Sequence, residues 1–275
     1  MGIRNAVHKT IAYAQRNGSR AAFFAAIERL SDNRKDRKYT YVQLPEEVLK
    51  EQRQEYKLLA EKETMVRFSI VVPLYNTPEQ FLKEMIDSVI NQTYENWELV
   101  LADASETPLE TAQKYAREDP RINYYHLDEN KGISSNTNAG LKKATGEYIG
   151  LLDHDDVLTP DALYEVSRVI RESMHKGKLA RFTDCPLRLI YSDEDKFDDK
   201  TGRYYEHHQK PAFNMDYLMS NNYICHFTVM RADIIKRLKL RGEFDGAQDY
   251  DLFLRACAET ALFMPQASGQ IVHLL

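Results

Sequence analysis

A short apolar run that ends in three acidic residues is the feature that most restricts how this chain can fold. The run extends from Tyr148 to Leu152, and Asp153, Asp155 and Asp156 follow within four positions. A continuous apolar run of this length is typical of a strand that is covered on both faces of a sheet. In open α/β sheets, ligands bind beyond the carboxyl ends of the strands, which is where these acids fall. The stretch therefore predicts an α/β sheet with an acidic site at one edge.

Carboxylates held so close together repel one another unless a positive charge lies between them. Divalent cations such as Mn²⁺ and Mg²⁺ accept carboxylate oxygens and keep positions open for phosphate oxygens. We therefore expect a divalent metal at this edge, together with a phosphate-bearing ligand. The alternative interpretation is a solvated acidic turn before a helix that Thr159 caps.

Strand and helix patterns alternate along the central part of the chain. We expect strands at residues 68–72, 97–102 and 122–125, and helices at residues 77–90 and 134–144. The segment 77–80 has the form of a capping box with proline at the first helical position. Strands that are separated by helices form parallel crossovers. The sequence therefore predicts the α/β class, with a doubly wound and mostly parallel sheet.

Several classes of protein are disfavoured by the same sequence. It contains neither a G-x-G-x-x-G turn nor a G-x-x-x-x-G-K-[ST] loop, which argues against dinucleotide dehydrogenases and P-loop enzymes. The net charge of −5 argues against a nucleic-acid partner. The three cysteines form no CxxC pair and are typical of reduced core residues in a cytoplasmic protein.

Residues 1–64 differ from the rest of the chain. They carry 13 Lys and Arg against 9 Asp and Glu, and their apolar residues recur at helical spacing. We expect a helical N-terminal appendage here, followed by the catalytic domain at residues 65–275. The alternative for the appendage is a basic helix on a membrane surface, which would make the protein peripherally associated with a membrane.

Six motifs occur in a fixed order between Phe68 and the C-terminus. They are Val71–Asn76, Glu98–Asp103, Asn130–Ile133, Leu151–Asp156, Tyr191–Asp195 and Gly246–Leu252. Together they closely resemble the family 2 inverting glycosyltransferases with the GT-A fold, in the branch that builds bacterial O-antigen and rhamnan chains. The resemblance implies a Rossmann-like nucleotide-binding half and an acceptor half. It also implies that the protein is a hexosyltransferase of the cytoplasm, where a location at the inner face of the cell membrane is one option.

The resemblance implies a UDP-sugar donor, with dTDP-rhamnose as the second choice, and a glycan or lipid-linked glycan acceptor. The residues implied to bind the nucleotide are Pro73, Tyr75, Asp103, Lys131 and Asp153. Among these, Asp103 would accept the imide hydrogen of uracil or thymine, Tyr75 would stack on the base, and Asp153 would bind ribose. Asp155 would hold Mn²⁺ or Mg²⁺ between the two phosphates, with Asp156 as a second ligand.

Further roles follow from the same resemblance. An acceptor hydroxyl that attacks the anomeric carbon must lose its proton to a carboxylate, and Asp249 occupies the family's base position. We expect Asp251 to be a charge at a helix N-terminus instead. The acids implied to lie on the acceptor side are Asp193, Glu194 and Asp195. In the family, a histidine beyond this region completes the metal site, so the resemblance implies that the chain is a piece of a longer protein.

Two other functions compete with this interpretation. A sugar-nucleotide pyrophosphorylase would need a Gly-rich loop with a basic residue after the first strand, and residues 73–76 offer none. A sugar-nucleotide or glycan-binding module without turnover is the non-enzymatic alternative. Assays of sugar transfer or donor hydrolysis separate this module from an enzyme.

Overall fold

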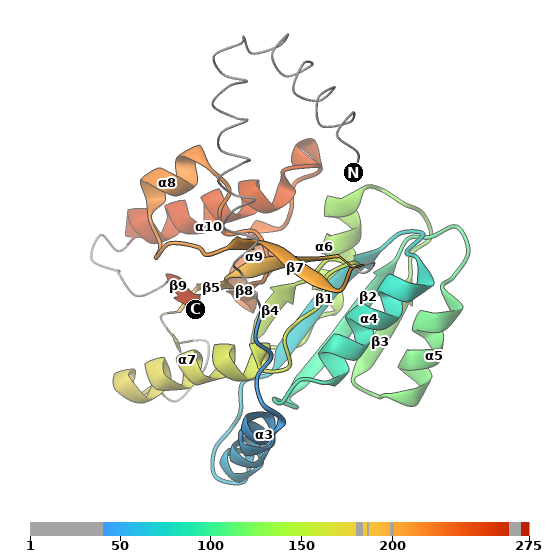
Figure 1. The fold of residues 1–275 in the computed structure, drawn as a ribbon. Helices are drawn as coiled ribbons and strands as arrows, with labels where there is room; N and C mark the ends of the chain where they lie inside the picture. The colour runs from blue at the N-terminus through green and yellow to red at the C-terminus, as the bar shows by residue number, and fades with distance from the viewer. Residues whose placement is uncertain (1–40, 180–183, 186, 199–200, 264–270, 275) are drawn as a thin grey trace. The chain divides into compact units, whose positions relative to one another are not determined.

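The computed structural model describes residues 41–179, 184–185, 187–198, 201–263 and 271–274 (Figure 1). The chain divides into two compact units. The larger unit contains residues 44–193 and 210–275, and the smaller one contains residues 1–43 and 194–209. The candidate site belongs to the larger unit.

A mixed sheet forms the centre of the larger unit. Its seven strands lie in the order β3-β2-β1-β4-β8-β5-β9. Their bounds are β1 Phe68–Leu74, β2 Trp97–Asp103, β3 Ile122–His126, β4 Tyr148–Leu151, β5 Leu189–Ser192, β8 Thr228–Arg231 and β9 Ile271–Leu274. Strand β8 runs antiparallel to both of its neighbours, whereas the other adjacent pairs are parallel. The prediction of a mostly parallel α/β sheet is therefore confirmed.

Helices cover both faces of this sheet, as the coloured ribbon in Figure 1 shows. One face carries α3 (Glu46–Ala60), α4 (Glu79–Ile90), α5 (Glu110–Glu118) and α7 (Ala162–Gly177). The other carries α6 (Ile133–Lys143), α8 (Met215–Ser220), α9 (Ala232–Leu238) and α10 (Gln248–Phe263). Side chains alternate along β1, so that Ile70 and Val72 pack on the first face and Val71 packs on the second. This two-sided burial explains why the strand is continuously apolar.

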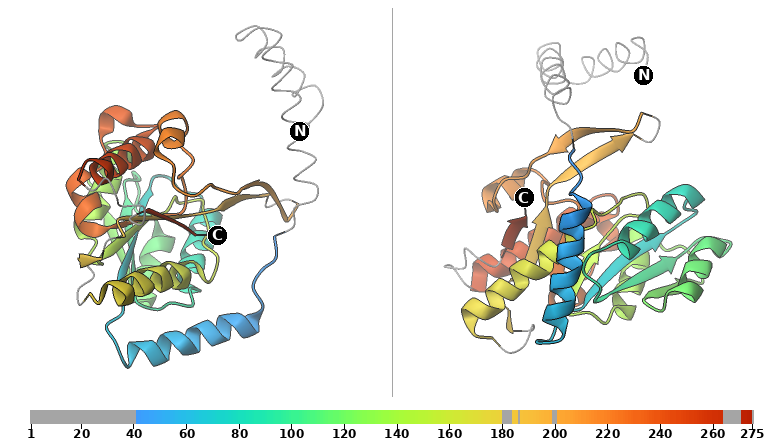
Figure 2. Two further views of the ribbon diagram at one scale, coloured as in Figure 1. Left: turned by 90° about the vertical axis from the view of Figure 1, so that its left-hand side faces the viewer. Right: turned by 60° about the horizontal axis from the view of Figure 1, so that its bottom comes forward.

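Helix α3 packs against the larger unit, although the expected boundary at residue 64 would assign it to the appendage. The Tyr56 ring meets Tyr94 with centroids 4.8 Å apart, and Thr93 Oγ1 donates a hydrogen bond of 2.9 Å to Gln52 Oε1. In the right-hand view of Figure 2, α3 crosses α7. The compact unit accordingly begins at Leu44.

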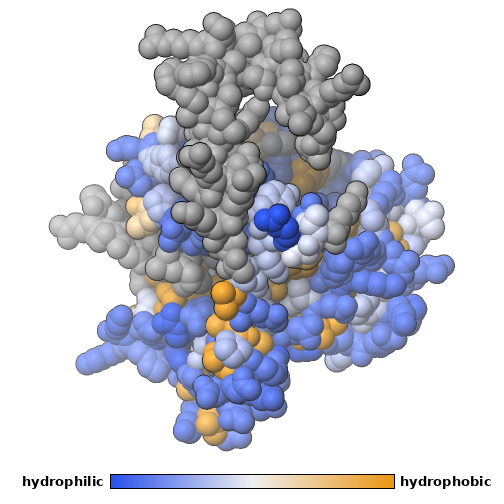
Figure 3. Space-filling view, in the orientation of Figure 1, coloured by the Kyte–Doolittle hydropathy of each residue, from blue (hydrophilic) through white to orange (hydrophobic). Residues whose placement is uncertain are grey.

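Residues 1–40, which hold most of the expected appendage, lie outside the described residues. The division of the chain into an appendage and a catalytic domain therefore stays a prediction. No helix among the described residues is both long enough and apolar enough to span a bilayer. On the face drawn in Figure 3, most of the described surface is hydrophilic.

The described part of the smaller unit is largely a hairpin of β6 (Glu194–Asp198) and β7 (Arg203–His208). Tyr204 lies between two other aromatic rings, with its centroid 4.6 Å from that of Tyr41 and 4.9 Å from that of Phe197. These ring contacts tie residue 41 to the hairpin, which explains why segments far apart in sequence share one compact unit.

A buried glutamate joins three segments of the larger unit. Glu98 on β2 accepts hydrogen bonds from Ser69 Oγ at 2.6 Å and from the Thr145 amide and hydroxyl at 2.5 and 2.9 Å. Arg67 forms an ion pair with it at 3.3 Å. Burial alone would raise the pKa of Glu98, but these hydrogen bonds and Arg67 hold that pKa below its usual value of 4.5.

We predict that Glu98→Gln lowers the free energy of unfolding by roughly 1–3 kcal/mol at pH 7, because charge-assisted hydrogen bonds are lost. A carboxylate with a depressed pKa stabilises the fold above its unfolded-state pKa and loses this contribution as the pH falls through the folded-state pKa. The difference between the wild type and Glu98→Gln should therefore shrink below pH 4.5. Urea unfolding at a series of pH values, from pH 7 down to the lowest pH at which the protein stays folded, measures this difference. Glu95→Gln, at an exposed position three residues earlier, is the matched control, and an equal loss in both variants would contradict the prediction.

Candidate functional site

The candidate site lies at the edge of the sheet where the parallel strands end. In the register of the sheet, Leu74 at the end of β1 pairs with Asp103 at the end of β2. The last residue of β4, Leu151, pairs with Val71. The loops after β1, β2 and β4 therefore leave the sheet at one edge, and β1 and β4 flank the point where the strand order reverses. Ligands of doubly wound sheets bind at such a point.

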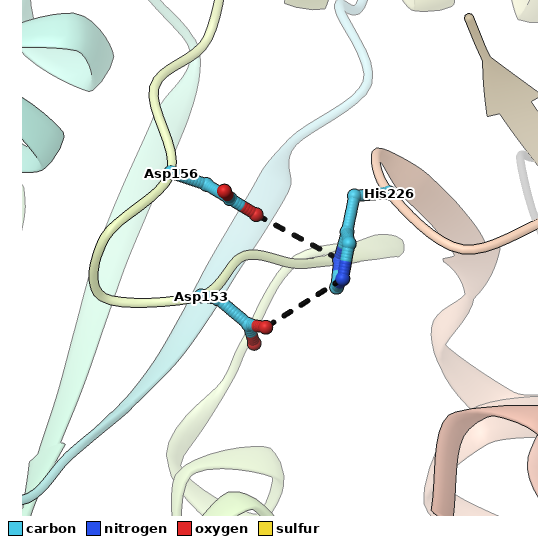
Figure 4. A group of neighbouring side chains, drawn as sticks. All are labelled: Asp153, Asp156 and His226. Atoms are coloured by element: carbon cyan, nitrogen blue, oxygen red, sulfur yellow. Dashed lines mark ion pairs between the residues drawn. The ribbon is translucent and has the colours of Figure 1, made fainter. Parts of the chain in front are cut away.

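Three side chains at this edge form a group that could hold a metal ion (Figure 4). His226 Nε2 lies 3.6 Å from Asp153 Oδ2, and His226 Nδ1 lies 3.9 Å from Asp156 Oδ2. One ligand atom from each residue lies within 4.8 Å of the others. Two carboxylates and an imidazole suit Mn²⁺, and carboxylate oxygens also suit Mg²⁺. The donor set therefore fits a divalent cation.

The pairing of β4 with β8 explains why His226 belongs to this group. Leu151 at the end of β4 pairs with Thr228 at the start of β8, and the two strands are antiparallel. Asp153 follows this pair by two residues and His226 precedes it by two, so both lie beyond the same end of the two strands. His226 was not among the residues predicted from the sequence, because the histidine of the metal site was expected further along the chain.

Burial and nearby charges shift the pKa of Asp153. Asp153 is 45% exposed, yet the protein around its carboxyl group removes enough water to raise its pKa. The charges of Asp155 and Asp249 raise this pKa further, and His226 lowers it. Asp249 is therefore electrostatically coupled to the loop after β4, although it lies on a different element.

Asp155 and Asp156 differ in placement. Asp156 is part of the group around His226, whereas the Asp155 carboxylate lies outside it, 57% exposed and 3.9 Å from His154 Nδ1. A backbone hydrogen bond of 3.3 Å from Asp156 to the Asp153 carbonyl closes the turn that brings these two acids together. The candidate metal group therefore contains Asp153 and Asp156 but not Asp155. From the sequence, Asp155 was expected to hold the metal with Asp156 as a second ligand, and Asp153 was expected to bind ribose. These roles stay predictions.

Asp103, the residue expected to bind the base, is 0% exposed. Its Oδ1 accepts the Ser105 amide at 2.9 Å, and its Oδ2 accepts the Leu109 amide at 3.0 Å and the Tyr124 hydroxyl at 2.6 Å. Burial alone would raise the pKa of Asp103, but these hydrogen bonds keep it below the usual value. In this structure, Asp103 therefore shapes the loop after β2.

The loops after β1 and β2 are tied together through Leu74 and Asn76, the neighbours of Tyr75 in sequence. The Asn76 amide donates to Ser105 Oγ at 2.8 Å, and the Ala104 amide donates to the Leu74 carbonyl at 2.9 Å. Tyr75 itself is exposed, and Pro73 is partly buried near the end of β1. An exposed aromatic ring whose neighbouring backbone is held by hydrogen bonds can stack on a planar base.

Lys131 is not part of the metal group. It is exposed on the loop before α6, where its ammonium lies 2.6 Å from Glu129 Oε1. This ion pair raises the pKa of Lys131. No contact described in the structure joins Lys131 to the acids after β4.

The structure separates the two acids at the start of α10. Asp249 Oδ2 accepts a hydrogen bond of 2.9 Å from Asn222 Nδ2. Asp251 is buried and is paired with Arg241 and with Arg255, the latter at 2.7 Å. These arginines, Arg241 first, lower the pKa of Asp251. Asp251 is therefore held by partners within the fold. The role of Asp249 as the catalytic base stays a prediction.

The three acids assigned to the acceptor side fall in different compact units. Asp193 belongs to the larger unit, where its Oδ1 accepts the Lys210 amide at 2.7 Å. Glu194 and Asp195 belong to the hairpin of the smaller unit and lie 3.1 Å from His208 and 2.5 Å from His207, respectively. Binding of an acceptor by these acids stays a prediction.

Comparison with known proteins places the chain among glycosyltransferases. The model of glycosyl transferase family 2 matches residues 69–239. The O-antigen biosynthesis protein RfbC of Myxococcus xanthus is 33% identical over 197 residues, covering 70% of this chain and 14% of that protein. The putative colanic acid biosynthesis glycosyl transferase WcaA of Escherichia coli K12 is 30% identical over 215 residues, covering 75% of this chain and 72% of that protein. The uncharacterized protein y4gI of Sinorhizobium fredii is 42% identical over 195 residues, and the chain spans 20% of its length.

Solved structures share the fold. Residues 1–349 of TarS from S. aureus, in complex with UDP, match with a TM-score of 0.58 at 20% identity, covering 76% of this chain and 57% of that one. The mannosyltransferase PcManGT from Pyrobaculum calidifontis, in complex with GDP-Man and Mn²⁺, matches with a TM-score of 0.52 at 15% identity, covering 82% and 64%. Together with the family match, these structures confirm the predicted GT-A fold.

We predict that His226→Ala and Asp156→Asn each weaken Mn²⁺ binding at least about tenfold, or 1.4 kcal/mol, because the first removes a donor atom from the group and the second removes a negative charge from it. Asp155→Asn keeps all three donors and is the matched control, so it should weaken binding less. Isothermal titration of Mn²⁺ into each folded variant measures the effect. A larger loss in Asp155→Asn than in Asp156→Asn would restore the ligand assignment made from the sequence.

Proposed function

Because the chain belongs to glycosyl transferase family 2, we propose that it transfers a hexose from a nucleoside diphosphate sugar to a glycan or lipid-linked glycan acceptor, with inversion at the anomeric carbon. The observation that carries this proposal is the group of Asp153, Asp156 and His226, with Asp249 coupled to it, at the carboxyl edge of the sheet. A metal site and a separate carboxylate are the two chemical elements that such a transfer needs. The family match also favours a transferase over a pyrophosphorylase or a binding module.

In the proposed reaction, the bond between the anomeric carbon and the diphosphate breaks while the acceptor oxygen forms a glycosidic bond on the opposite face. Asp153, Asp156 and His226 would hold Mn²⁺ or Mg²⁺. The cation, when bound, neutralises negative charge on the departing diphosphate. The Asp249 carboxylate would take the proton of the acceptor hydroxyl, and the Asn222 amide would fix its orientation through the bond to Oδ2.

We propose that the donor is a UDP-sugar, with a dTDP-sugar as the second choice. Tyr75 would stack on the base, and Asp103 with the loop it holds would recognise the imide edge. The TarS structures, in complex with UDP and with UDP-GlcNAc, support this choice. The complex of PcManGT with GDP-Man shows that a protein of this fold can also bind a purine nucleotide, so the base preference must be measured.

The relatives named for O-antigen and colanic acid biosynthesis support a role in bacterial surface polysaccharide synthesis. A lipid-linked acceptor would place the transfer in the cytoplasm at the inner face of the membrane, and this location is part of the proposal. Since the chain spans 14% of RfbC, this role concerns the transfer step alone. Release of UDP from a panel of UDP-hexoses with Mn²⁺ tests the proposed function, and absence of both binding and release across the panel would contradict it.

We predict that Asp103→Asn lowers the affinity for UDP relative to GDP by at least about tenfold, or 1.4 kcal/mol, because the amide cannot accept in the same way as the carboxylate. Competition among UDP, dTDP, GDP and ADP at a fixed Mn²⁺ concentration measures the ratio. The same substitution should also lower the unfolding midpoint, since it disturbs three internal hydrogen bonds. A lower midpoint with an unchanged UDP to GDP ratio would leave Asp103 with a purely structural role.

We predict that Asp249→Asn slows transfer by roughly 10²- to 10⁴-fold, as expected for loss of a general base, while UDP affinity stays within a few-fold. The amide keeps the shape of the side chain but cannot take the proton. Asp251→Asn is the matched control, because it breaks the arginine pairs and should reduce stability more than turnover. Rates should be measured with the UDP-hexose that the donor panel selects. Normal turnover in Asp249→Asn together with slow turnover in folded Asp251→Asn would move the base to Asp251.

A further inference from the structure

A buried lysine holds the backbone on which His226 is carried. Lys210 is 2% exposed, although lysine is almost never fully buried unless its charge is compensated. Its ammonium donates to the Ile224 carbonyl at 2.7 Å and to the His226 carbonyl. These two carbonyls stand on either side of Cys225, so one side chain fixes the path of the chain into His226.

The segment held by Lys210 has little regular structure of its own. Residues 221–227 form neither helix nor strand, and β8 begins at Thr228. Buried carbonyl groups in such a segment need partners from outside it. An ammonium group supplies charge-assisted hydrogen bonds, which are stronger than bonds between neutral groups.

Lys210 is itself anchored to the sheet. Its amide donates to Asp193 Oδ1 at 2.7 Å, and Asp193 directly follows β5. The neighbouring residue Ser192 also binds this segment, because its amide donates a hydrogen bond of 3.2 Å to the Phe227 carbonyl. The lysine therefore connects the end of β5 to the segment that carries His226.

We propose that Lys210 is a positioning residue for the metal site, which keeps the His226 imidazole beside Asp153 and Asp156. The inference rests on the proposed metal site and adds a residue that lies outside the group of candidate ligands. Asp153 and Asp156 both come from the loop after β4, whereas His226 is the one member of the group from the segment before β8. Any shift of that segment moves the imidazole relative to both carboxylates. Outer-shell partners of this kind typically contribute 10- to 100-fold to metal affinity.

Lys210→Met tests this role, because methionine fills similar space without donors. We expect Mn²⁺ affinity, measured by isothermal titration, to fall by about 10- to 100-fold. Lys236→Met is the matched control, since the Lys236 ammonium also donates to a backbone carbonyl, that of Ala144 at 2.5 Å, but lies on α9 away from the group. Its Mn²⁺ affinity should equal that of the wild type.

A double-mutant cycle separates positioning from a general loss of structure. If Lys210 acts through His226, Lys210→Met should weaken Mn²⁺ binding no further in the His226→Ala background. If the two losses instead add, Lys210 acts on the site by another route and the inference is wrong. The inference is equally wrong if folded Lys210→Met binds Mn²⁺ as tightly as the wild type.

Lys210→Gln provides a second variant if Lys210→Met does not fold. Its amide keeps the position polar but is too short to reach both carbonyls, so we expect weaker Mn²⁺ binding than in the wild type. Unchanged binding in folded Lys210→Gln overturns the inference. Failure of the proposed metal site gives a different result, because His226→Ala alone would then leave Mn²⁺ binding unchanged.

Discussion

Strand β8 pairs antiparallel with β4 and β5, and the arrangement of the site depends on that direction. A parallel strand at this place would send its end to the site and its start to the opposite edge of the sheet. An antiparallel strand does the reverse, so the segment just before β8 reaches the edge where β1, β2 and β4 end. That segment supplies Asn222, which holds Asp249, and His226, which meets Asp153 and Asp156. One short stretch of chain thus connects the candidate base with the candidate metal ligands.

Buried charges stabilise the segments next to the site. Burial of a charge is costly unless hydrogen bonds or an opposite charge compensate for it. Asp103 binds two amides of the loop after β2, Asp251 binds two arginines near the start of α10, and Lys210 binds carbonyls before β8. Each of these groups lies close to a place where the chain leaves regular structure. Their common effect is to hold irregular segments rigid, which a site built from loops requires.

The sequence allowed the first part of the sheet to be predicted, because strands β1 to β4 are apolar runs separated by amphipathic helices. The acidic edge followed from the position of Asp153 and its neighbours after such a run. His226 could not be found in this way, since its place depends on the direction of β8, and no local pattern encodes strand direction. That Asp156 joins Asp153 in the group while Asp155 does not likewise depends on a turn closed by one backbone hydrogen bond. The internal partners of Asp103 lie two, six and 21 residues away, and the last of these becomes a neighbour only when β2 pairs with β3.

Charge at the edge of the sheet determines how the two expected ligands should bind. This region is negatively charged, because it contains Asp153, Asp155, Asp156 and Asp249. The charges of Asp155 and Asp249 contribute to the raised pKa of Asp153. A diphosphate adds further negative charge, so the field opposes its binding to the protein alone. A divalent cation reverses the sign of the interaction, because it is attracted both by the carboxylates and by the phosphate oxygens. Metal and nucleotide should therefore raise each other's affinity, and by thermodynamic linkage the two enhancement factors must be equal.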